Sequence, residues 1–152
     1  MMDFTIARAR FAVYAVFLVA LAGVLDATYL TVEHFRGVIP PCTGFSNCEA
    51  VLTSSYATVF GIPIALFGAL YYATAATLAM IVFRKGNAMA GLLLQVVVGA
   101  AFLISVLLVG IQQFVLSAYC VYCLVSAGIT TVLAVCVALM RRFARLPVSI
   151  QN

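Results

Sequence analysis

Residues 88–111 read AMAGLLLQVVVGAAFLISVLLVGI, an apolar run that contains no Asp, Glu, Lys or Arg. A transmembrane helix needs about 20 predominantly apolar residues, so this run is long enough to cross a bilayer. Three further windows also qualify, at roughly 11–32, 62–83 and 118–140. The runs are unbroken rather than alternating, which favours helices over the strands of a membrane β-barrel. We therefore expect a bundle of four transmembrane helices.

The composition excludes a water-soluble domain. Of the 152 residues, 66% are hydrophobic and only 8% are charged, and the mean hydropathy is +1.23. A water-facing surface needs far more polar cover than this. The four windows leave no room for a separate soluble domain, so we expect residues 1–152 to form a single all-α integral membrane domain.

The basic residues predict the orientation in the membrane. Seven of the eight Lys and Arg residues lie on one side of the expected spans, with only Arg36 on the other. By the positive-inside rule, both termini should face the cytoplasm across a plasma (inner) membrane, and loop 33–61 should face the periplasm or exterior. The net charge of +4 is then an orientation signal rather than a nucleic-acid-binding patch. The seven are Arg8, Arg10, Arg84, Lys85, Arg141, Arg142 and Arg145.

The outer loop carries one pair of cysteines. Cys42 follows two prolines, and Cys48 comes after a short flexible turn. Their spacing can close as a disulfide, whereas a zinc site would need a second ligand pair nearby. The stretch 48–60, with Asn47 as a possible cap, is too short to cross a membrane. We expect it to form an interfacial half-helix that covers the bundle.

A second pair, Cys120 and Cys123, stands at the start of the last span. Residues three positions apart share a helix face, so these thiols could form a disulfide in the first turn. Ser117 is placed as an N-cap, and the positive helix end beside Cys120 should favour its thiolate. With the loop pair, this puts four thiols at the outer face. They could be a redox relay or two structural disulfides.

Three other residues have open or structural interpretations. Asp26 lies within the first span, where an acidic residue suggests a functional role unless it is simply at the outer interface. His34 is expected to be a solvated residue at the end of that span. Cys136 lies deep in the last span and is interpreted as a small core residue.

Several motifs together resemble the vitamin K epoxide reductase family, in particular its bacterial and archaeal homologues. The resemblance covers about residues 10–140, and the combination is more specific than any single motif. The motifs are Cys42-x5-Cys48, AVLTSSYA at 50–57, FGIP at 60–63 and Cys120-x-x-Cys123. The other four-span disulfide oxidase family, of the Dsb type, has its C-x-x-C in the first outer loop, so its order is the reverse.

The resemblance implies a role for each outer cysteine. Cys42 would exchange with a thioredoxin-fold, DsbA-like partner, and Cys48 would pass the disulfide to or from Cys120. Cys123 would face a quinone of the ubiquinone, menaquinone or vitamin K type. Some members carry a fused thioredoxin-like domain, whereas this sequence stops at Asn152, so the partner is expected to be a separate protein. The resting disulfide pairing stays open.

The same resemblance predicts the quinone site and the reaction. Ser54, Phe60 and Cys123 are expected to contact the quinone. The mammalian tyrosine that contacts the substrate oxygen corresponds here to Ala127, which favours quinone reduction over epoxide reduction. The leading hypothesis is therefore a thiol:quinone oxidoreductase for disulfide formation. The alternatives are a vitamin K epoxide or quinone reductase, and a non-enzymatic bundle with structural disulfides.

Overall fold

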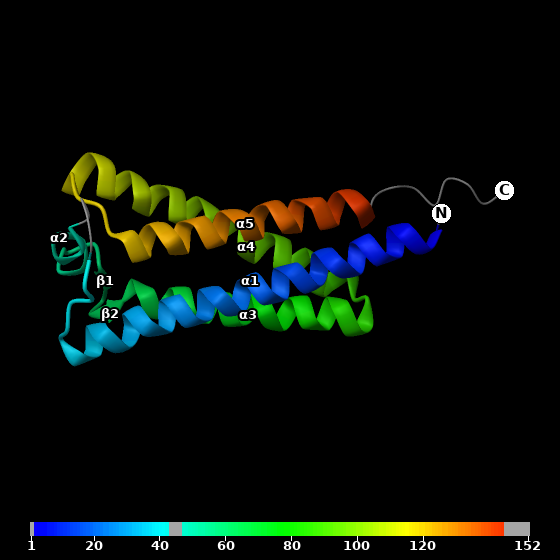
Figure 1. Cartoon of the computed structure of the whole chain (residues 1–152), viewed down its shortest axis with the longest axis horizontal. Coiled ribbons are helices and arrows are strands. Elements are labelled where there is room, and N and C mark those ends of the chain that lie inside the picture. Colours follow the sequence, from blue (N-terminus) through cyan, green and yellow to red (C-terminus); the bar gives the residue numbers. More distant parts are fainter. Residues whose placement is uncertain (1, 43–46, 145–152) are drawn as a thin grey trace.

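The structure is a computed structural model that describes residues 2–42 and 47–144. Within these residues, four helices are long and apolar enough to cross a membrane, and they run side by side as one bundle (Figure 1). They are α1 (Met2–Arg36), α3 (Ile64–Lys85), α4 (Ala88–Ile111) and α5 (Val121–Ala144). The protein is therefore a multi-pass, all-α membrane bundle, as the apolar windows predict.

The short elements gather at one end of the bundle (Figure 1). The connection between α3 and α4 lies at the opposite end, with the first turns of α1 and the last turns of α5. The chain thus crosses the bundle four times within the described residues. The short elements are α2 (Cys48–Leu52), β1 (Thr58–Val59), β2 (Ile62–Pro63) and the π-helix η1 (Gln112–Leu116).

The half-helix is shorter than predicted. It begins at Cys48 as expected, but α2 ends at Leu52 instead of continuing to residue 60. The hydroxyl of Thr53 donates to the Glu49 carbonyl and that of Ser54 to the Val51 carbonyl, both at 2.7 Å. Hydroxyl side chains that bond to nearby backbone compete with helix propagation. The side-chain hydrogen bonds of Thr53 and Ser54 therefore coincide with the end of α2 at Leu52.

A β-hairpin occupies the rest of the predicted half-helix. Strands β1 and β2 are antiparallel, and Thr58 pairs with Pro63. The two residues of the turn, Phe60 and Gly61, both have positive φ, at 52° and 78°. This is the backbone of a type I′ hairpin turn, which glycine adopts at little cost. Helix α3 consequently begins at Ile64, two residues later than expected, with Pro63 as its cap.

The core lies where α1 meets α3 and α5, while α4 closes the bundle by packing on α3 and α5. The buried side chains of α1 follow one another at steps of three, four or seven residues, which places them on one helix face. Small residues on α3 allow a close approach between the two helices. The buried stripes are Val13, Val16, Ala20, Ala27 and Leu30 on α1 and Tyr72, Ala75, Ala76 and Ala79 on α3.

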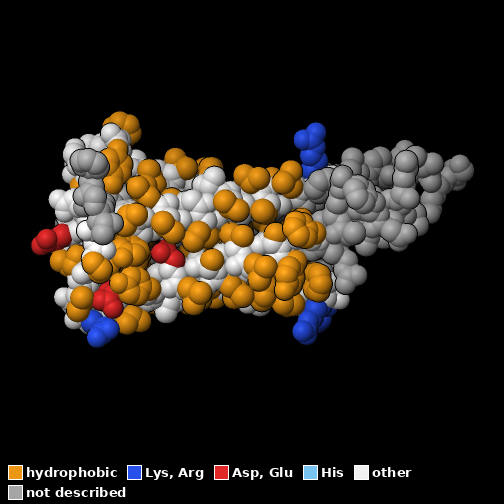
Figure 2. All heavy atoms as spheres, viewed as in Figure 1, with side chains coloured by type: hydrophobic (Ala, Val, Ile, Leu, Met, Phe, Trp, Pro, Cys, Tyr) orange, Lys and Arg blue, Asp and Glu red, His pale blue; other side chains and the backbone are white. Residues whose placement is uncertain are grey.

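The outer surface of the bundle is apolar. On the face shown in Figure 2, hydrophobic side chains cover the middle of the described part, and the Lys and Arg side chains that are coloured lie near its two ends. Leu103 and Leu107 of α4 remain more than 60% exposed. An apolar surface of this kind is stable in contact with lipid chains, whereas its exposure to water is unfavourable.

Candidate active site

Cys120 is the residue that caps α5. The helix begins at Val121, and the main-chain N–H of Cys123 donates to the Cys120 sulfur at 3.4 Å. The Cys120 carbonyl accepts from the N–H of Leu124 at 3.0 Å. A side-chain acceptor that bonds the third helical N–H is the arrangement of an N-cap. The positive end of the α5 dipole therefore acts on the Cys120 sulfur.

The predicted cap at Ser117 is wrong. Ser117 ends η1 in the left-handed conformation, with φ 47° and ψ 34°, and α5 starts four residues later. The left-handed residue turns the chain away from the direction of η1. The thiol of Cys120 thus takes the capping position that the sequence analysis assigned to a hydroxyl.

Gln112 holds the segment between η1 and α5, a role that the sequence analysis missed. Its side-chain oxygen accepts from the Cys120 N–H at 3.0 Å, and its main-chain oxygen accepts from Ala118 at 3.1 Å. Gln112 is only 4% exposed. A buried amide needs partners, and this one finds them in the backbone before α5. The sequence signal for this role is a polar amide side chain directly after the apolar run 88–111.

The loop cysteines form a disulfide. Cys42 and Cys48 are bonded, with their Cα atoms 6.1 Å apart, and Cys48 is the first residue of α2. Asn47 caps that helix as expected, because its side-chain oxygen accepts from the N–H of Ala50 at 3.2 Å. The intervening residues 43–46 lie outside the described part of the chain.

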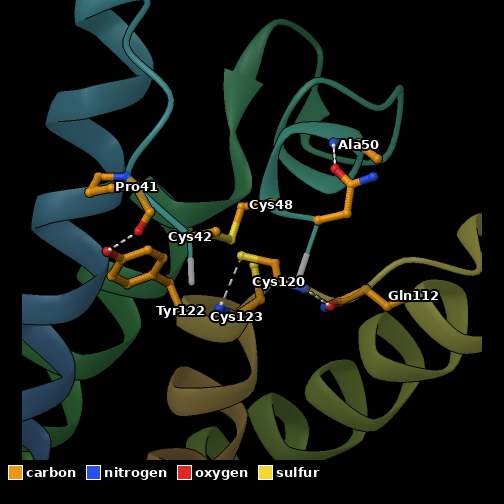
Figure 3. The surroundings of a disulfide bond; sticks show 9 residues. Pro41, Cys42, Cys48, Ala50, Gln112, Cys120, Tyr122 and Cys123 are labelled. Atoms are coloured by element: carbon orange, nitrogen blue, oxygen red, sulfur yellow. Dashed lines mark hydrogen bonds between the residues drawn. A yellow bond between two sulfur atoms is a disulfide. The ribbon is translucent and has the colours of Figure 1, made fainter. Parts of the chain in front are cut away.

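Two hydrogen bonds attach this loop to the start of α5. The Asn47 N–H donates to the Tyr119 carbonyl at 2.8 Å, and the Tyr122 hydroxyl donates to the Pro41 carbonyl at 3.1 Å. Tyr119 accepts the first bond and Tyr122 donates the second, and these two residues stand next to Cys120 and Cys123 in the sequence. The loop is therefore anchored on both sides of the cysteine pair, as Figure 3 shows for Tyr122 and Pro41.

All four outer cysteines lie together. Cys48 and Cys120 are 1% and 0% exposed and share a buried cluster, against which Cys42 and Cys123 also pack. Figure 3 shows the loop disulfide directly beside the two sulfurs of α5. Cys120 and Cys123 are free thiols. A short path for thiol–disulfide exchange thus leads from the loop to α5.

The surroundings of Cys120 favour its thiolate. A hydrogen bond from the Cys123 thiol, aided by the main-chain N–H groups of Cys123 and Tyr122, lowers the pKa of Cys120 from 9.0 to about 7. Burial and the negative charge of Asp26 act in the opposite direction. Since the thiolate is the nucleophile in disulfide exchange, Cys120 is reactive near neutral pH.

A cavity of about 240 Å³ lies between the long helices and the segment 51–54 at the end of α2. Side chains of α1, α3, α4 and α5 form its walls, and Val51, Leu52 and Ser54 cover it. Cys123 and Ala127 of α5 line it as well. Of the four outer cysteines, Cys123 alone belongs to the described lining.

The predicted quinone contacts are only partly brought together. Ser54 and Cys123 line the cavity, but Phe60 does not belong to its described lining. The Phe60 side chain is fully exposed, because it stands at the tip of the β1–β2 turn. The structure therefore does not bring Phe60 to the cavity, and its contact with a quinone stays a prediction.

The structure also shows the positions of Asp26, His34 and Cys136. One carboxylate oxygen of Asp26 is buried and has no hydrogen-bond partner among the described residues. His34 is exposed on α1 and reaches the edge of the cavity. Cys136 packs against the core of the bundle, as expected.

A comparison with protein-family profiles matches residues 14–138 to the Vitamin K epoxide reductase family. The matched region includes all five cysteines and the whole lining of the cavity. No curated protein matches the chain.

Proposed function

The chain belongs to the vitamin K epoxide reductase family, and from this premise we propose that it is a thiol:quinone oxidoreductase that reoxidises a thioredoxin-fold partner. Electrons pass from the partner to Cys42 and Cys48, then to Cys120 and Cys123, and finally to a quinone. The family itself implies a membrane oxidoreductase of the thiol and quinone class. The order of the cysteines and the direction of transfer are our proposal.

One observation supports this order above all others. Cys48 and Cys120 are buried in the same cluster, whereas Cys123 is the outer cysteine that belongs to the described cavity lining. We therefore assign thiol–disulfide exchange between the two pairs to Cys48 and Cys120, and electron transfer to a ligand to Cys123. Cys42 is only partly buried, which suits it for exchange with an outside protein.

The thiol steps balance as two successive exchanges. After the partner has reduced the loop pair, the Cys48 thiolate attacks Cys120 in the Cys120–Cys123 disulfide. The Cys48–Cys120 bond forms, and Cys123 leaves as a thiolate. Cys42 then attacks Cys48, the loop disulfide forms and Cys120 leaves. The product has an oxidised loop pair and two free α5 thiols, which is the state of the cysteines in this structure.

The second half-reaction restores the α5 disulfide. A quinone supplies an acceptor for two electrons and two protons and leaves as the quinol. Cys120 and Cys123 together give up two electrons and two protons when their disulfide forms, so the two halves balance. The Cys120–Cys123 bond forms as the two electrons pass to the quinone, and Cys120 enters this step as the thiolate because its pKa is about 7.

The cavity suits the ring of a quinone. Its volume of about 240 Å³ lies just below the range of about 300–1,000 Å³ for ligand pockets, which suits one ring rather than a whole prenylated lipid. Phe67 of α3 and Ile104 of α4 line the cavity and are also 46% and 57% exposed. The cavity thus reaches the apolar outer surface between these helices, where a prenyl tail could continue into lipid.

The charge distribution supports a periplasmic or extracellular site. Arg84 and Lys85 end α3, and Arg141 and Arg142 lie near the end of α5, at the opposite end of the bundle from the four outer cysteines (Figure 1). By the positive-inside rule, that end faces the cytoplasm and the cysteines face the oxidising side. A secreted thioredoxin-fold protein would meet them there.

The test uses purified protein in lipid nanodiscs with a short-chain ubiquinone and a reduced thioredoxin-fold protein. Thiol loss and quinol formation should proceed in equal molar amounts. Replacing Cys123 with alanine should abolish both, because the cavity then lacks its thiol. Replacing Cys136 with alanine is the matched control and should leave both rates unchanged, because Cys136 packs in the core.

Continued quinol formation by Cys123→Ala would overturn the proposal. Equal loss of activity in Cys136→Ala would show that the assay reports folding rather than electron transfer. If the four outer cysteines served only as structural links, mild reduction would lower stability and wild-type protein would form no quinol.

A further inference from the structure

Tyr71 carries a buried hydroxyl that the fold leaves without a partner. Its oxygen forms no hydrogen bond with any described residue. The neighbouring Tyr72 is different, because its hydroxyl bonds to the Ser126 carbonyl at 2.8 Å and to the hydroxyls of Ser126 and Thr130 at 2.9 Å. The Thr130 hydroxyl lies near that of Tyr71 but outside hydrogen-bond geometry, and it bonds to Tyr72 instead. Buried polar groups in native proteins are normally paired, so this exception requires an explanation.

The unpaired hydroxyl belongs to the wall of the cavity. Tyr71 lines it from α3, and Cys123 lines it from α5. The ring of Tyr71 packs on that of Tyr72, with centroids 4.6 Å apart, which restricts its orientation. Tyr71 is thus a rigid residue that shares a mainly apolar cavity with the thiol proposed to face the ligand.

Several other polar groups of the lining are engaged within the protein. Ser54 donates to the Val51 carbonyl, and Ser126 and Thr130 bond to Tyr72. Gln112 uses its side-chain oxygen to hold Cys120. Ala127, on the same wall as Cys123, has no polar side-chain atom to offer. Among the described lining residues, Tyr71 is the one with a buried side-chain oxygen that has no hydrogen-bond partner. A ligand with a hydrogen-bond acceptor would find this donor inside the cavity.

We propose that the Tyr71 hydroxyl donates a hydrogen bond to a carbonyl oxygen of the quinone and so orients its ring relative to Cys123. This inference rests on the proposed function and adds the residue that selects for a carbonyl acceptor. The hydrogen bond gains strength as negative charge develops on that oxygen, because a charged acceptor binds a donor more tightly than a neutral one. Tyr71 thus favours both binding of the quinone and its reduction.

Equilibrium binding tests the inference without turnover. The probes are a short-chain ubiquinone and the analogue in which both carbonyl groups are replaced by methoxy groups, each titrated into protein in nanodiscs. Wild-type protein should bind the quinone more tightly, by about three- to tenfold for one net hydrogen bond. Tyr71→Phe removes only the hydroxyl, and its preference for the quinone should be smaller than that of wild type by that factor.

Tyr14→Phe is the matched control, because Tyr14 of α1 is 52% exposed and lies outside the described cavity lining. It should unfold near the wild-type temperature and keep the preference for the quinone. Tyr71→Phe without ligand should unfold at or above the wild-type temperature, because it buries one unpaired polar group fewer. The infrared stretch of a ¹³C-labelled quinone carbonyl should move to higher frequency in Tyr71→Phe.

The outcomes separate the two proposals. An unchanged preference and carbonyl frequency in Tyr71→Phe would overturn the role of Tyr71, while quinol formation by the same protein would leave the proposed function intact. If wild-type protein bound neither probe, both proposals would fail.

Discussion

The main-chain N–H of Cys120 donates to the side-chain oxygen of Gln112 at 3.0 Å, and both residues are buried. Because Gln112 is the first residue of η1 and Cys120 caps α5, this bond fixes the position of the sulfur relative to α4. Cys120 must meet both the loop disulfide and Cys123, so its backbone cannot shift far without breaking one of the two contacts.

The variant Gln112→Met tests whether the hydrogen bond between Gln112 and Cys120 stabilises the protein. The variant keeps the length of the side chain but leaves the buried Cys120 N–H without an acceptor, which should cost about 1–3 kcal/mol of unfolding free energy. Thermal unfolding in detergent measures the loss. Gln113→Met is the matched control, because Gln113 is exposed, and it should stay near wild type. Equal unfolding temperatures for the two variants would show that the bond adds no stability.

The pKa of Cys120 predicts how the absorbance of its thiolate depends on pH. At a pKa of about 7, the thiolate predominates above pH 7 and disappears as the pH falls through 7. The ultraviolet absorbance of the thiolate should therefore fall to about one-tenth of its plateau one unit below that pKa. The titration is measured in a Cys136→Ala background, and replacing Cys120 with alanine as well should abolish it.

Removing the thiol of Cys123 should raise the pH at which half of Cys120 is ionised, which is the midpoint of this titration. The hydrogen bond from this thiol is the largest of the effects that lower the pKa of Cys120, so Cys123→Ala should move the pH profile upward towards the ordinary value of 9.0. Cys123→Ser retains a hydroxyl donor and should shift it less. An unchanged midpoint in Cys123→Ala would assign the activation of Cys120 to the helix end alone.

Gly23→Ala tests the close contact between α1 and α3. A Cβ atom at Gly23 would overlap the ring of Tyr72, which is fully buried and held by its three hydrogen bonds. The ring cannot move aside easily, so overpacking should cost about 1–3 kcal/mol. Gly99→Ala on α4 is the control, because a Cβ there meets no described atom within 4 Å. Similar unfolding temperatures for both variants would contradict the tight contact.

The helices were predictable from sequence because their determinants are local. An uninterrupted apolar run such as 88–111 specifies a membrane helix by its length, and α4 has those same bounds. The family could also be identified, since its motifs combine four cysteines at two spacings. The cysteine pairs were expected at one face because short connections force neighbouring spans to alternate in direction.

The details of the site depend on contacts between distant segments. Ser117 looked like a cap because the π-helix before it has no clear sequence signal. The half-helix was extended too far because Thr53 and Ser54 could equally have faced water within a helix. Phe60 belongs to a motif, but the turn directs it outward. Tyr71 could not be distinguished from the paired Tyr72, since their difference lies in partners on α5.

Tyr122 should control how fast the two cysteine pairs exchange. Its hydroxyl holds the Pro41 carbonyl, next to Cys42, so Tyr122→Phe frees one side of the loop. Loss of one net hydrogen bond should slow formation of the Cys48–Cys120 disulfide about two- to tenfold. The rate is measured in a Cys42→Ala, Cys123→Ala background, with a mild oxidant and quenched samples analysed for the crosslink.

Tyr119→Phe distinguishes anchoring by a side chain from a general effect of tyrosine loss near α5. Tyr119 holds the other side of the loop through its main-chain carbonyl, which accepts from Asn47 and survives the substitution. Its crosslinking rate should therefore match that of the background protein. If both variants slowed the reaction equally, the Tyr122 bond would have no specific part in placing Cys48 beside Cys120. If only Tyr122→Phe slowed it, the order of exchange proposed for the four cysteines would gain direct kinetic support.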